Sequence, residues 1–339
     1  MFLFKRNGYY HLEYFDESEN RIKRISTKST TKPEALKFLT DFKCEYIDRP
    51  KVKFTTLKQF QKDYLTSIEN IRTFSYKNSV KFSFDKLIAF LKEDYPLSKI
   101  TNRDIENYIN SHFQVSKYAT ALVYRTLKSA FTKAVAWNYL SDNPFQKVKL
   151  PILPKPIPSF INENELRIIL TNETNNNLKD IYQFAFHTGM RLNEILNLMW
   201  SSIDFNNKEI TIRNTESFTT KNKKERVIPM NQTIINLLQK RIPLYKRVDK
   251  DLLIFEKIKD VKYSPFFVSK RFKKAVIKSG LDSKLHFHSL RHSFCSNLVM
   301  RGCPINVIKE LAGHSQISVT MGYTHVLKEN LQQAVNLLD

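Results

Sequence analysis

Five side chains in the second half of the chain are of the types that can break a phosphodiester bond. They are Arg191, His288, Arg291, His314 and Tyr323. Without a metal, this reaction needs a nucleophile at phosphorus, donors for the charge on the equatorial oxygens, and an acid for the departing 5′ oxygen. Arginine suits the second task, because its planar fork bonds two phosphate oxygens and stays charged. The set predicts a site that breaks DNA by covalent attachment to tyrosine.

The first arginine lies in the stretch His187-Thr188-Gly189-Met190-Arg191-Leu192-Asn193-Glu194. The glycine is expected to end one helix, so that the next helix begins close to Arg191. Glu194 follows three residues later, where its carboxylate can hold a neighbouring group of the site in position. Taken alone, this stretch also fits an ordinary surface arginine that pairs with Glu194.

His288 and Arg291 are three residues apart on an expected helix, so they face one target together. The apolar residues of this helix are expected to point into the core, and they are Leu290, Phe294 and Leu298. His286, His288 and His292 are also compatible with a metal site. No acidic or cysteine partner completes such a site nearby in the sequence, and a phosphate agrees better with the adjacent arginine. We therefore expect no metal.

Tyr323 is the candidate nucleophile, and His314 precedes it. A helix from about Ile305 is expected to stop at Gly313, and Ser315 can cap the next helix. A tyrosine hydroxyl has a pKa of about 10 and needs a base or cationic surroundings before it attacks. The neighbouring arginines and histidines would have to supply them.

These residues belong to a chain that we expect to be mainly α with small β sheets, an α+β fold. Residues 1–52 are expected to form a small sheet with one helix, and residues 53–150 an all-helical domain. Residues 151–158 contain four prolines and form a semi-rigid linker. Residues 159–339 are expected to form a mixed, mainly helical domain that carries the candidate site.

Several local patterns are specific enough to test. Two strands, at 9–14 and 21–27, should precede a helix at 32–46. Thr101 should cap a helix, and the clearest helix spans residues 116–137. The inner face of that helix should contain Val123, Leu127, Ala130, Phe131 and Ala134. The last domain should contain helices at 162–170, 177–187 and 233–246, and a hairpin of strands at 208–214 and 225–230.

Two groups of basic residues are candidate DNA contacts. The first lies on the polar face of the 116–137 helix and consists of Lys117, Arg125 and Lys128. The second lies in the first module and consists of Arg21, Lys23 and Arg24, together with Lys5 and Arg6. A merely solvated basic face is the alternative in each case. The excess of basic residues in the whole chain favours contact with phosphate.

The composition excludes several classes of protein. A formal net charge of +22 favours a polyanionic partner, with nucleic acid as the first candidate. The three cysteines are widely spaced, without the pattern of a zinc site or a disulfide framework, so a reducing cytoplasm fits best. The sequence contains no apolar run that predicts a membrane span and no apolar signal peptide at its N-terminus.

This order of two arginines, two histidines and a C-terminal tyrosine resembles the tyrosine recombinase family, also called the phage integrase family. The resemblance covers essentially residues 159–339, and it is carried by the frames Thr-Gly-Met-Arg-Leu-Asn-Glu, His-Ser-Leu-Arg-His-Ser-Phe, Leu-Ala-Gly-His-Ser and Tyr-Thr-His. The helical domain before the linker resembles the family's core-binding domain. The first fifty residues resemble the arm-binding modules of integrases from phages and conjugative elements.

The resemblance implies a role for each candidate residue. Tyr323 would attack phosphorus and leave a 3′-phosphotyrosyl bond. Arg191 and Arg291 would clamp the nonbridging oxygens, and His314 would donate to one of them. His288 would help to manage the tyrosine proton.

The family also has a lysine on a hairpin turn, which protonates the departing 5′ oxygen. Lys221 matches it best by position, and Lys223 and Lys224 remain alternatives. Glu194 falls where the family keeps a supporting acid.

The resemblance further implies partners. Double-stranded DNA would be the substrate, and four copies of the chain would act on two DNA sites. The phosphotyrosine retains the energy of the broken bond, so no cofactor is expected. A directionality factor or a host DNA-bending protein is a further candidate partner, and we expect a cytoplasmic, nucleoid-associated protein. The tail after Tyr323 has an apolar helix face, which packs on its own domain or on a neighbouring copy: Val326, Leu327, Leu331, Val335 and Leu338.

Within the family, an integrase that inserts and excises a mobile element is the preferred interpretation, because of the extra N-terminal module. The alternatives are an Xer-like chromosome-dimer resolvase and a type IB topoisomerase. A catalytically inactive DNA-binding regulator would keep the fold without the chemistry. The intact set of arginines, histidine and tyrosine argues against the regulator.

Overall fold

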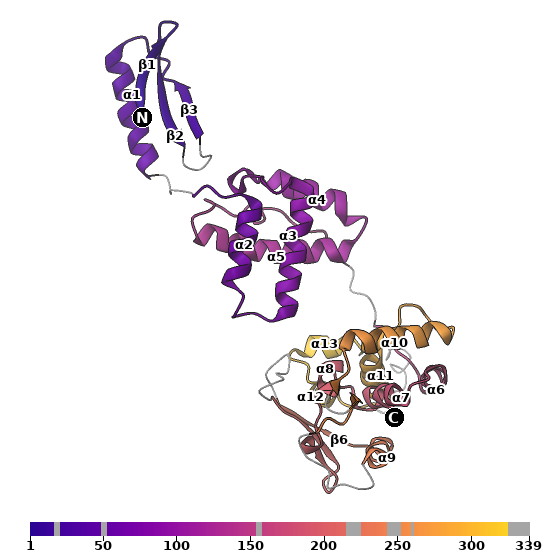
Figure 1. Cartoon of the computed structure of the whole chain (residues 1–339). Helices are drawn as coiled ribbons and strands as arrows, with labels where there is room; N and C mark the ends of the chain where they lie inside the picture. The colour runs from indigo at the N-terminus through magenta and orange to yellow at the C-terminus, as the bar shows by residue number, and fades with distance from the viewer. Residues whose placement is uncertain are drawn as a thin grey trace, which may run out of the picture. The chain divides into compact units, whose positions relative to one another are not determined.

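The computed structural model describes residues 1–16, 21–48, 53–153, 158–214, 225–242, 252–258 and 261–324. The chain divides into two compact units, residues 1–155 and 156–339. It is mainly helical with small antiparallel sheets, as predicted (Figure 1). In the ranges described, no helix is both long enough and apolar enough to span a membrane. The division of residues 1–155 into a module and a helical domain stays a prediction.

A three-stranded antiparallel sheet opens the first unit, with strands β1 (Phe2–Arg6), β2 (Tyr9–Asp16) and β3 (Arg21–Ser26). Strand β1 was not predicted. Asn7 and Gly8, both with positive φ, join β1 to β2 in the tight turn that Asn-Gly favours in hairpins. Helix α1 (Lys32–Asp48) packs on one face of the sheet, where the rings of Phe42 and Tyr14 are 4.8 Å apart.

The rest of the first unit is helical, with α2 (Leu57–Ser67), α3 (Phe74–Leu91), the short 3-10 helix Leu97–Lys99, α4 (Asn102–Phe113) and α5 (Lys117–Ala136). Phe60 lies at the centre of their core, with ring centroids 5.5 Å from those of Phe84 and Phe131. Thr101 caps α4 in a reciprocal pair with Asp104, as predicted. All five residues predicted for the inner face of α5 are buried.

The second unit has eight described α-helices, which are α6 (Glu163–Asn172), α7 (Asn176–Thr188), α8 (Leu192–Leu196), α9 (Gln232–Arg241), α10 (Pro265–Lys278), α11 (Phe287–Met300), α12 (Ile305–Ala312) and α13 (Ile317–Met321). Its strands are β4 (Ile203–Asp204), β5 (Glu209–Ile212) and β6 (Arg226–Pro229) in one sheet, and β7 (Glu256–Ile258) and β8 (Val261–Lys262) in another. The predicted helices at 162–170 and 177–187 and the β5–β6 hairpin are confirmed, whereas the helix predicted at 233–246 ends at Arg241, and residues 243–246 lie outside the described residues. Strand β4 was not predicted.

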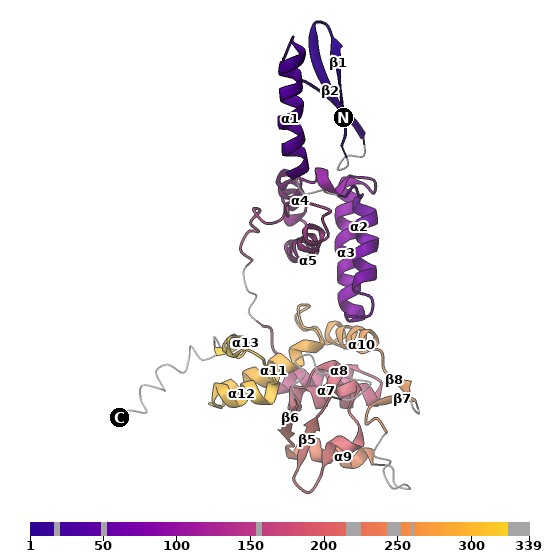
Figure 2. The same cartoon turned by 90° about the vertical axis from the view of Figure 1, so that its left-hand side faces the viewer.

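Helix α11 is the central element of this unit, because it packs against α7, α10 and α12 (Figure 2). Its first turn contributes Phe287 and Leu290 to the main core. There, the Phe287 ring contacts Tyr182 of α7 and Phe272 of α10, with centroids 6.1 and 5.8 Å apart. An aromatic core of this kind fixes the orientation of α11, and therefore of the polar residues on its other side.

Two left-handed glycines end the helices that precede the candidate residues. Gly189 ends α7 with φ +63°, and a Cβ at this position would collide with the ring of Phe294 on α11. Gly313 ends α12 with φ +67°. The expected cap at Ser315 is wrong: the N-cap of α13 is Gln316, whose backbone is extended, so the helix begins one residue later.

Candidate active site

Arg191 lies between the two glycine turns. It is the residue before α8, and its backbone NH and Nη1 both donate to Glu194, each over 2.9 Å. Its Nη2 donates to the carbonyl of Gly313, 3.0 Å away. The side chain thus joins the end of α7 to the end of α12, which are far apart in the sequence. It remains 22% exposed, so one side of the guanidinium faces outward.

Arg291 is the second arginine and is almost completely buried, with 2% exposure. Its Nη1 donates to the carbonyl of Gly189 over 2.7 Å. Its Nη2 is buried without a hydrogen-bond partner among the described residues. Burial, and then the charge of Arg191, lower the pKa of Arg291 to about 10, so it stays cationic at neutral pH. The structure therefore brings the two predicted arginines close enough for their charges to interact, with Arg291 bound to the carbonyl of Gly189 and Arg191 to that of Gly313.

Neutral histidines surround the arginines. Burial, and then the charge of Arg291, lower the pKa of His314 to about 3. Its Nδ1 contacts the hydroxyl of Thr320 at 2.9 Å. Desolvation of its ring, and then the charges of His292 and Arg291, also lower the pKa of His288, although the residue as a whole is exposed. The described residues contain no group of three or more metal-ligating side chains that could hold a metal ion.

Tyr323 is buried, with 2% exposure, in a small cluster with Cys295, Val299, Ile308 and Ala312. Its hydroxyl lies 2.7 Å from Nδ1 of His292, and its ring stacks near that of His314, with centroids 6.2 Å apart. Burial raises the pKa of Tyr323, and the charge of Arg291 opposes this effect. The hydroxyl is thus protonated in the free protein.

Two residues near the site were not predicted to belong to it. His292 contacts the tyrosine hydroxyl directly. The predicted His288 contacts the ring of His292, and the centroids of the two rings are 4.8 Å apart. Arg226 donates to both carboxylate oxygens of Glu194. The only signal for His292 was its place next to Arg291 in the frame His-Ser-Leu-Arg-His. Nothing in the sequence pattern around β6 singled out Arg226.

Glu194 is the shared acceptor of this region and is 3% exposed. Burial alone would raise its pKa. The hydrogen bonds and charge of Arg226, and then those of Arg191, outweigh burial and hold the pKa of Glu194 below its usual value. The carboxylate is therefore ionised and fixes two guanidinium groups at once.

Some predicted residues lie elsewhere. Lys221, Lys223 and Lys224 fall outside the described residues, as does the apolar tail from Val326. The six candidate DNA contacts all lie in the first unit, and they are Arg21, Lys23, Arg24, Lys117, Arg125 and Lys128.

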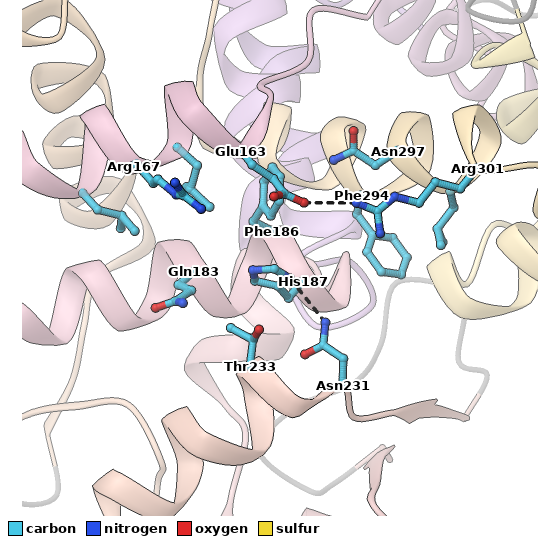
Figure 3. A pocket seen from close by; sticks show the side chains of 13 residues that line it. Glu163, Arg167, Gln183, Phe186, His187, Asn231, Thr233, Phe294, Asn297 and Arg301 are labelled. Atoms are coloured by element: carbon cyan, nitrogen blue, oxygen red, sulfur yellow. Dashed lines mark hydrogen bonds and ion pairs between the residues drawn. The ribbon is translucent and has the colours of Figure 1, made fainter.

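A separate pocket of about 460 Å³ lies between α6, α7 and α11 (Figure 3). Glu163 and Arg301 form an ion pair of 3.1 Å at its edge, and His187 contacts Asn231. None of the arginines, histidines or tyrosine of the candidate site lines it. Phe294, which packs on Gly189, forms part of its wall, so α11 separates this pocket from the candidate site.

Comparison with known proteins identifies the class of enzyme. The model of the phage integrase family matches residues 159–330, just over half of the chain, and this range includes every residue of the cluster. The chain belongs to the phage integrase family. It is 30% identical over 267 residues to the tyrosine recombinase XerA of Pyrococcus horikoshii, covering 76% of this chain and 87% of that one. It is 28% identical over 293 residues to XerC of Staphylococcus aureus, with 82% and 95% covered.

Solved structures agree in fold. A λ integrase dimer bound to a COC′ core site superposes with a TM-score of 0.65 at 19% identity, over 95% of this chain and 93% of that one. The Tn1549 transposon integrase with a circular intermediate DNA gives a TM-score of 0.66 at 20% identity, over 79% and 94%. This chain is therefore a tyrosine-type site-specific DNA recombinase with the integrase fold.

Proposed function

We propose that this recombinase cuts one DNA strand at a time through Tyr323. The observation that carries the proposal is the proximity of Arg191 and Arg291 to each other, with Nη2 of Arg291 buried without a partner among the described residues and the charge of Arg291 acting on the buried Tyr323. A buried cationic donor without an acceptor is costly, and a phosphate oxygen is the acceptor that fits a guanidinium best. Both arginines would bind the nonbridging oxygens, and His314 would donate to one of them.

In the cleavage step, Tyr323 Oη forms a bond to phosphorus while the bond from phosphorus to the 5′ oxygen breaks. The product is a 3′-phosphotyrosyl linkage and a free 5′ hydroxyl. The tyrosine proton has an acceptor in place, because a neutral His292 can take it at Nδ1 over the observed 2.7 Å. Burial, and then the charge of His286, lower the pKa of His292 to about 4, which keeps the ring neutral at physiological pH. His288 would assist through its contact with His292.

The departing 5′ oxygen needs a proton. We assign this role to Lys221 from the family pattern, with Lys223 and Lys224 as alternatives. All three lysines precede β6, whose first residue, Arg226, donates a hydrogen bond to Glu194. Glu194 would support the site by fixing Arg191 rather than by touching DNA.

For the whole reaction we propose double-stranded DNA as substrate and four copies of the chain on two sites. The support is the likeness in fold to a λ integrase tetramer bound to a Holliday junction, with a TM-score of 0.63 over 93% of this chain. Resealing uses the energy kept in the phosphotyrosine, so the reaction would proceed without a cofactor. A directionality factor or a host DNA-bending protein would decide the direction, and the enzyme would act in the cytoplasm at the nucleoid.

We propose integration and excision of a mobile element rather than resolution of chromosome dimers. The likeness in fold to λ integrase extends over 95% of this chain, whereas the likeness to the λ integrase fragment 75–356 covers 78%. The additional coverage supports an arm-binding module at residues 1–52, and we propose a core-binding domain at 53–150, a linker at 151–158 and a catalytic domain at 159–339.

The candidate DNA contacts differ in how available they are. Lys117 and Arg125 are exposed on α5, so they can reach phosphate. Lys128 is half-buried, and its ammonium donates to the hydroxyl of Tyr124 over 3.3 Å. We therefore expect Lys128 to contribute less to DNA binding than Lys117 and Arg125.

In the first module, Arg24 lies on the open face of the sheet, over the ring of Phe4. Arg21 and Lys23 alternate with it and point to the face that α1 covers. Lys23 also forms an ion pair with Asp16 over 2.7 Å. Arg24 is itself paired with Glu13, but its side chain remains 63% exposed, against 28% for Lys23, so we favour Arg24 over Lys23 as a contact to DNA bases or phosphates.

The decisive experiment uses a duplex built from the repeats that flank the gene, nicked so that the released 5′ strand diffuses away. Incubation should give a protein–DNA adduct that survives denaturation. Tyr323→Phe should abolish the adduct and retain DNA binding, because only the hydroxyl is lost. An adduct that persists in Tyr323→Phe would reject this tyrosine, and DNA binding without any adduct in the unmodified enzyme would favour a regulator. Direct repeats or a tRNA gene at the flanks would support integration.

A further inference from the structure

Thr320 lies in α13 between two residues of the candidate site and contacts both. It is completely buried, with 0% exposure. Its hydroxyl lies 2.9 Å from Nδ1 of His314. Its carbonyl accepts a hydrogen bond from the backbone N–H of Tyr323 over 3.0 Å. One buried residue is therefore bonded both to the histidine that is proposed to bind phosphate and to the nucleophile.

The backbone of His314 is fixed separately from its ring. Gly313 ends α12 in the left-handed conformation, and the N–H of His314 donates to the carbonyl of Lys309 over 3.0 Å. Arg191 donates to the carbonyl of Gly313. Helices α12 and α13 pack against each other (Figure 2). The main chain thus sets where the ring of His314 starts, and the contact with Thr320 sets how the ring is turned.

The role of His314 depends on which ring nitrogen carries its proton. Burial, and then the charge of Arg291, lower the pKa of His314 to about 3, so the ring is neutral at physiological pH. A neutral imidazole has one N–H, which donates, and one unprotonated nitrogen, which accepts. Only the N–H can bond a phosphate oxygen, because the other nitrogen would present a lone pair to it.

The hydroxyl of Thr320 distinguishes the two nitrogens. A hydroxyl has one hydrogen to donate, and a buried donor without an acceptor is costly. Among the described residues, the structure gives this hydroxyl one hydrogen-bond partner, Nδ1 of His314. If Nδ1 carried the ring proton, the hydroxyl hydrogen would have no acceptor there. The contact therefore favours an unprotonated Nδ1, which leaves the ring proton on Nε2.

We propose that Thr320 is a positioning residue, which donates to Nδ1 of His314 and so holds the ring in the form that carries its proton on Nε2 and donates it to a nonbridging oxygen of the scissile phosphate. The proposal rests on the proposed function, in which His314 binds that phosphate. Thr320 acts through the histidine and does not itself meet the phosphate. The ring of His314 is partly exposed, as a ligand of DNA must be.

The direct test reads the tautomer in the free enzyme by NMR. Protein labelled with ¹⁵N-histidine is studied at pH 7.5, where protonated and unprotonated ring nitrogens differ strongly in ¹⁵N chemical shift. The carbon-bound ring protons couple differently to the two nitrogens and so tell them apart. His314→Asn removes the signals of this ring and thereby identifies them. We expect a protonated Nε2 and an unprotonated Nδ1, and a proton on Nδ1 would overturn the proposal.

The second test measures single-turnover cleavage of the nicked duplex. Thr320→Val removes the hydroxyl and nearly keeps the shape, and we expect it to slow cleavage by about 10- to 100-fold, up to the loss of one hydrogen-bond donor to the transition state. Thr320→Ser keeps the hydroxyl and should cleave within a few-fold of the unmodified enzyme. In a His314→Ala background, Thr320→Val should slow cleavage no further, because Thr320 acts through the ring.

Thr188→Val is the matched control. The hydroxyl of Thr188 is also buried, with 1% exposure of the residue, but it donates to the carbonyl of Phe184 over 2.7 Å. Its loss should leave the ¹⁵N signals of His314 unchanged. Any effect of Thr188→Val on cleavage should be the same with and without the ring of His314.

Two kinetic outcomes would overturn the proposal by assigning Thr320 to packing alone. One is an equal loss in Thr320→Val and Thr320→Ser, and the other is an undiminished loss from Thr320→Val in the His314→Ala background. If Thr320→Val does not fold, the tautomer of the unmodified protein decides. Failure of the proposed function is a different result, because the unmodified enzyme would then give no Tyr323-dependent adduct, whichever tautomer His314 adopts.

Discussion

Tyr323 is held in a state that cannot attack. Its hydroxyl is buried and protonated, and Nδ1 of His292 lies 2.7 Å from it. The phosphate would enter beside Arg291, whose charge already opposes the effect of burial on the tyrosine pKa. We therefore propose that substrate binding and proton loss are coupled through the charge of Arg291, which acts on Tyr323.

The contact between His292 and Tyr323 leads to a prediction about proton transfer. His292→Ala should slow formation of the covalent adduct by about 100-fold or more, because the tyrosine loses its adjacent acceptor. His288→Ala should have a smaller effect, because the hydroxyl has its close contact with His292, and His288 contacts the ring of His292. Single-turnover cleavage rates of the two variants check this order, and the reverse order would return the role to His288.

Two glycines with positive φ, one inside the candidate site and one outside it, allow a matched test of crowding at the site. Gly313→Ala and Gly280→Ala both place a side chain at positive φ, which costs about 1–2 kcal/mol. Only the new Cβ at residue 313 also presses on Arg226, whereas residue 280 has open space. Gly313→Ala should therefore be less stable than Gly280→Ala by about 1 kcal/mol or more. Denaturant unfolding of both variants measures the difference. Equal losses of stability would mean that the side chain of Arg226 moves away from the new Cβ at little cost.

The sequence predicted most of the site residues because two arginines, two histidines and a tyrosine occur in family-specific frames. The same frames could not predict which histidine meets the tyrosine, since His288 and His292 differ only by one helical turn on α11. They could not predict Arg226 either. Its role arises from the packing of β6 against α12, a contact between positions 85 residues apart.

At the scale of elements, the start of α11 and the end of α12 form a group of histidines that the fold keeps neutral. The pKa values of His292 and His314 are lowered to about 4 and about 3, against about 6.5 in the unfolded chain. The unfolded chain thus binds more protons below pH 6.5. Stability should be complete above that pH and should fall as the pH drops from about 6.5 toward 4.

This pH dependence can be measured as the thermal midpoint between pH 7.5 and pH 5. His314→Asn should flatten the dependence, because it removes one group that titrates only in the unfolded chain. A midpoint that is constant over this range in the unmodified protein would contradict the assigned protonation states.

Helix boundaries were predictable where capping chemistry is local, as at Thr101, Gly189 and Gly313. They failed where the tertiary path of the chain decides, as at Ser315, where the backbone stays extended for one more residue before α13. Strand β1 lacks any clear alternation in exposure, and only its Asn-Gly turn marked it. Short strands of this kind are fixed by their partners more than by their own residues.

At the scale of the whole molecule, the net charge of +22 predicts that DNA binding weakens steeply with salt. Lys117→Gln should reduce the slope of log affinity against log salt by about 0.9, the value for one lost phosphate contact. Lys128→Gln should change the slope less and stability more, because its ammonium serves the hydroxyl of Tyr124. Binding measured over a series of salt concentrations checks both. Identical slopes in the two variants and the unmodified enzyme would remove α5 from the DNA interface.

The buried Nη2 of Arg291 has a consequence that reaches beyond catalysis. Without an anion, the interior of the second unit contains a donor that no described residue satisfies. The scissile phosphate would accept a hydrogen bond from this donor, so the same interaction would bind the DNA and stabilise the second unit. The second unit of such a recombinase would be most stable with its substrate bound, and it would lose stability when the phosphate leaves.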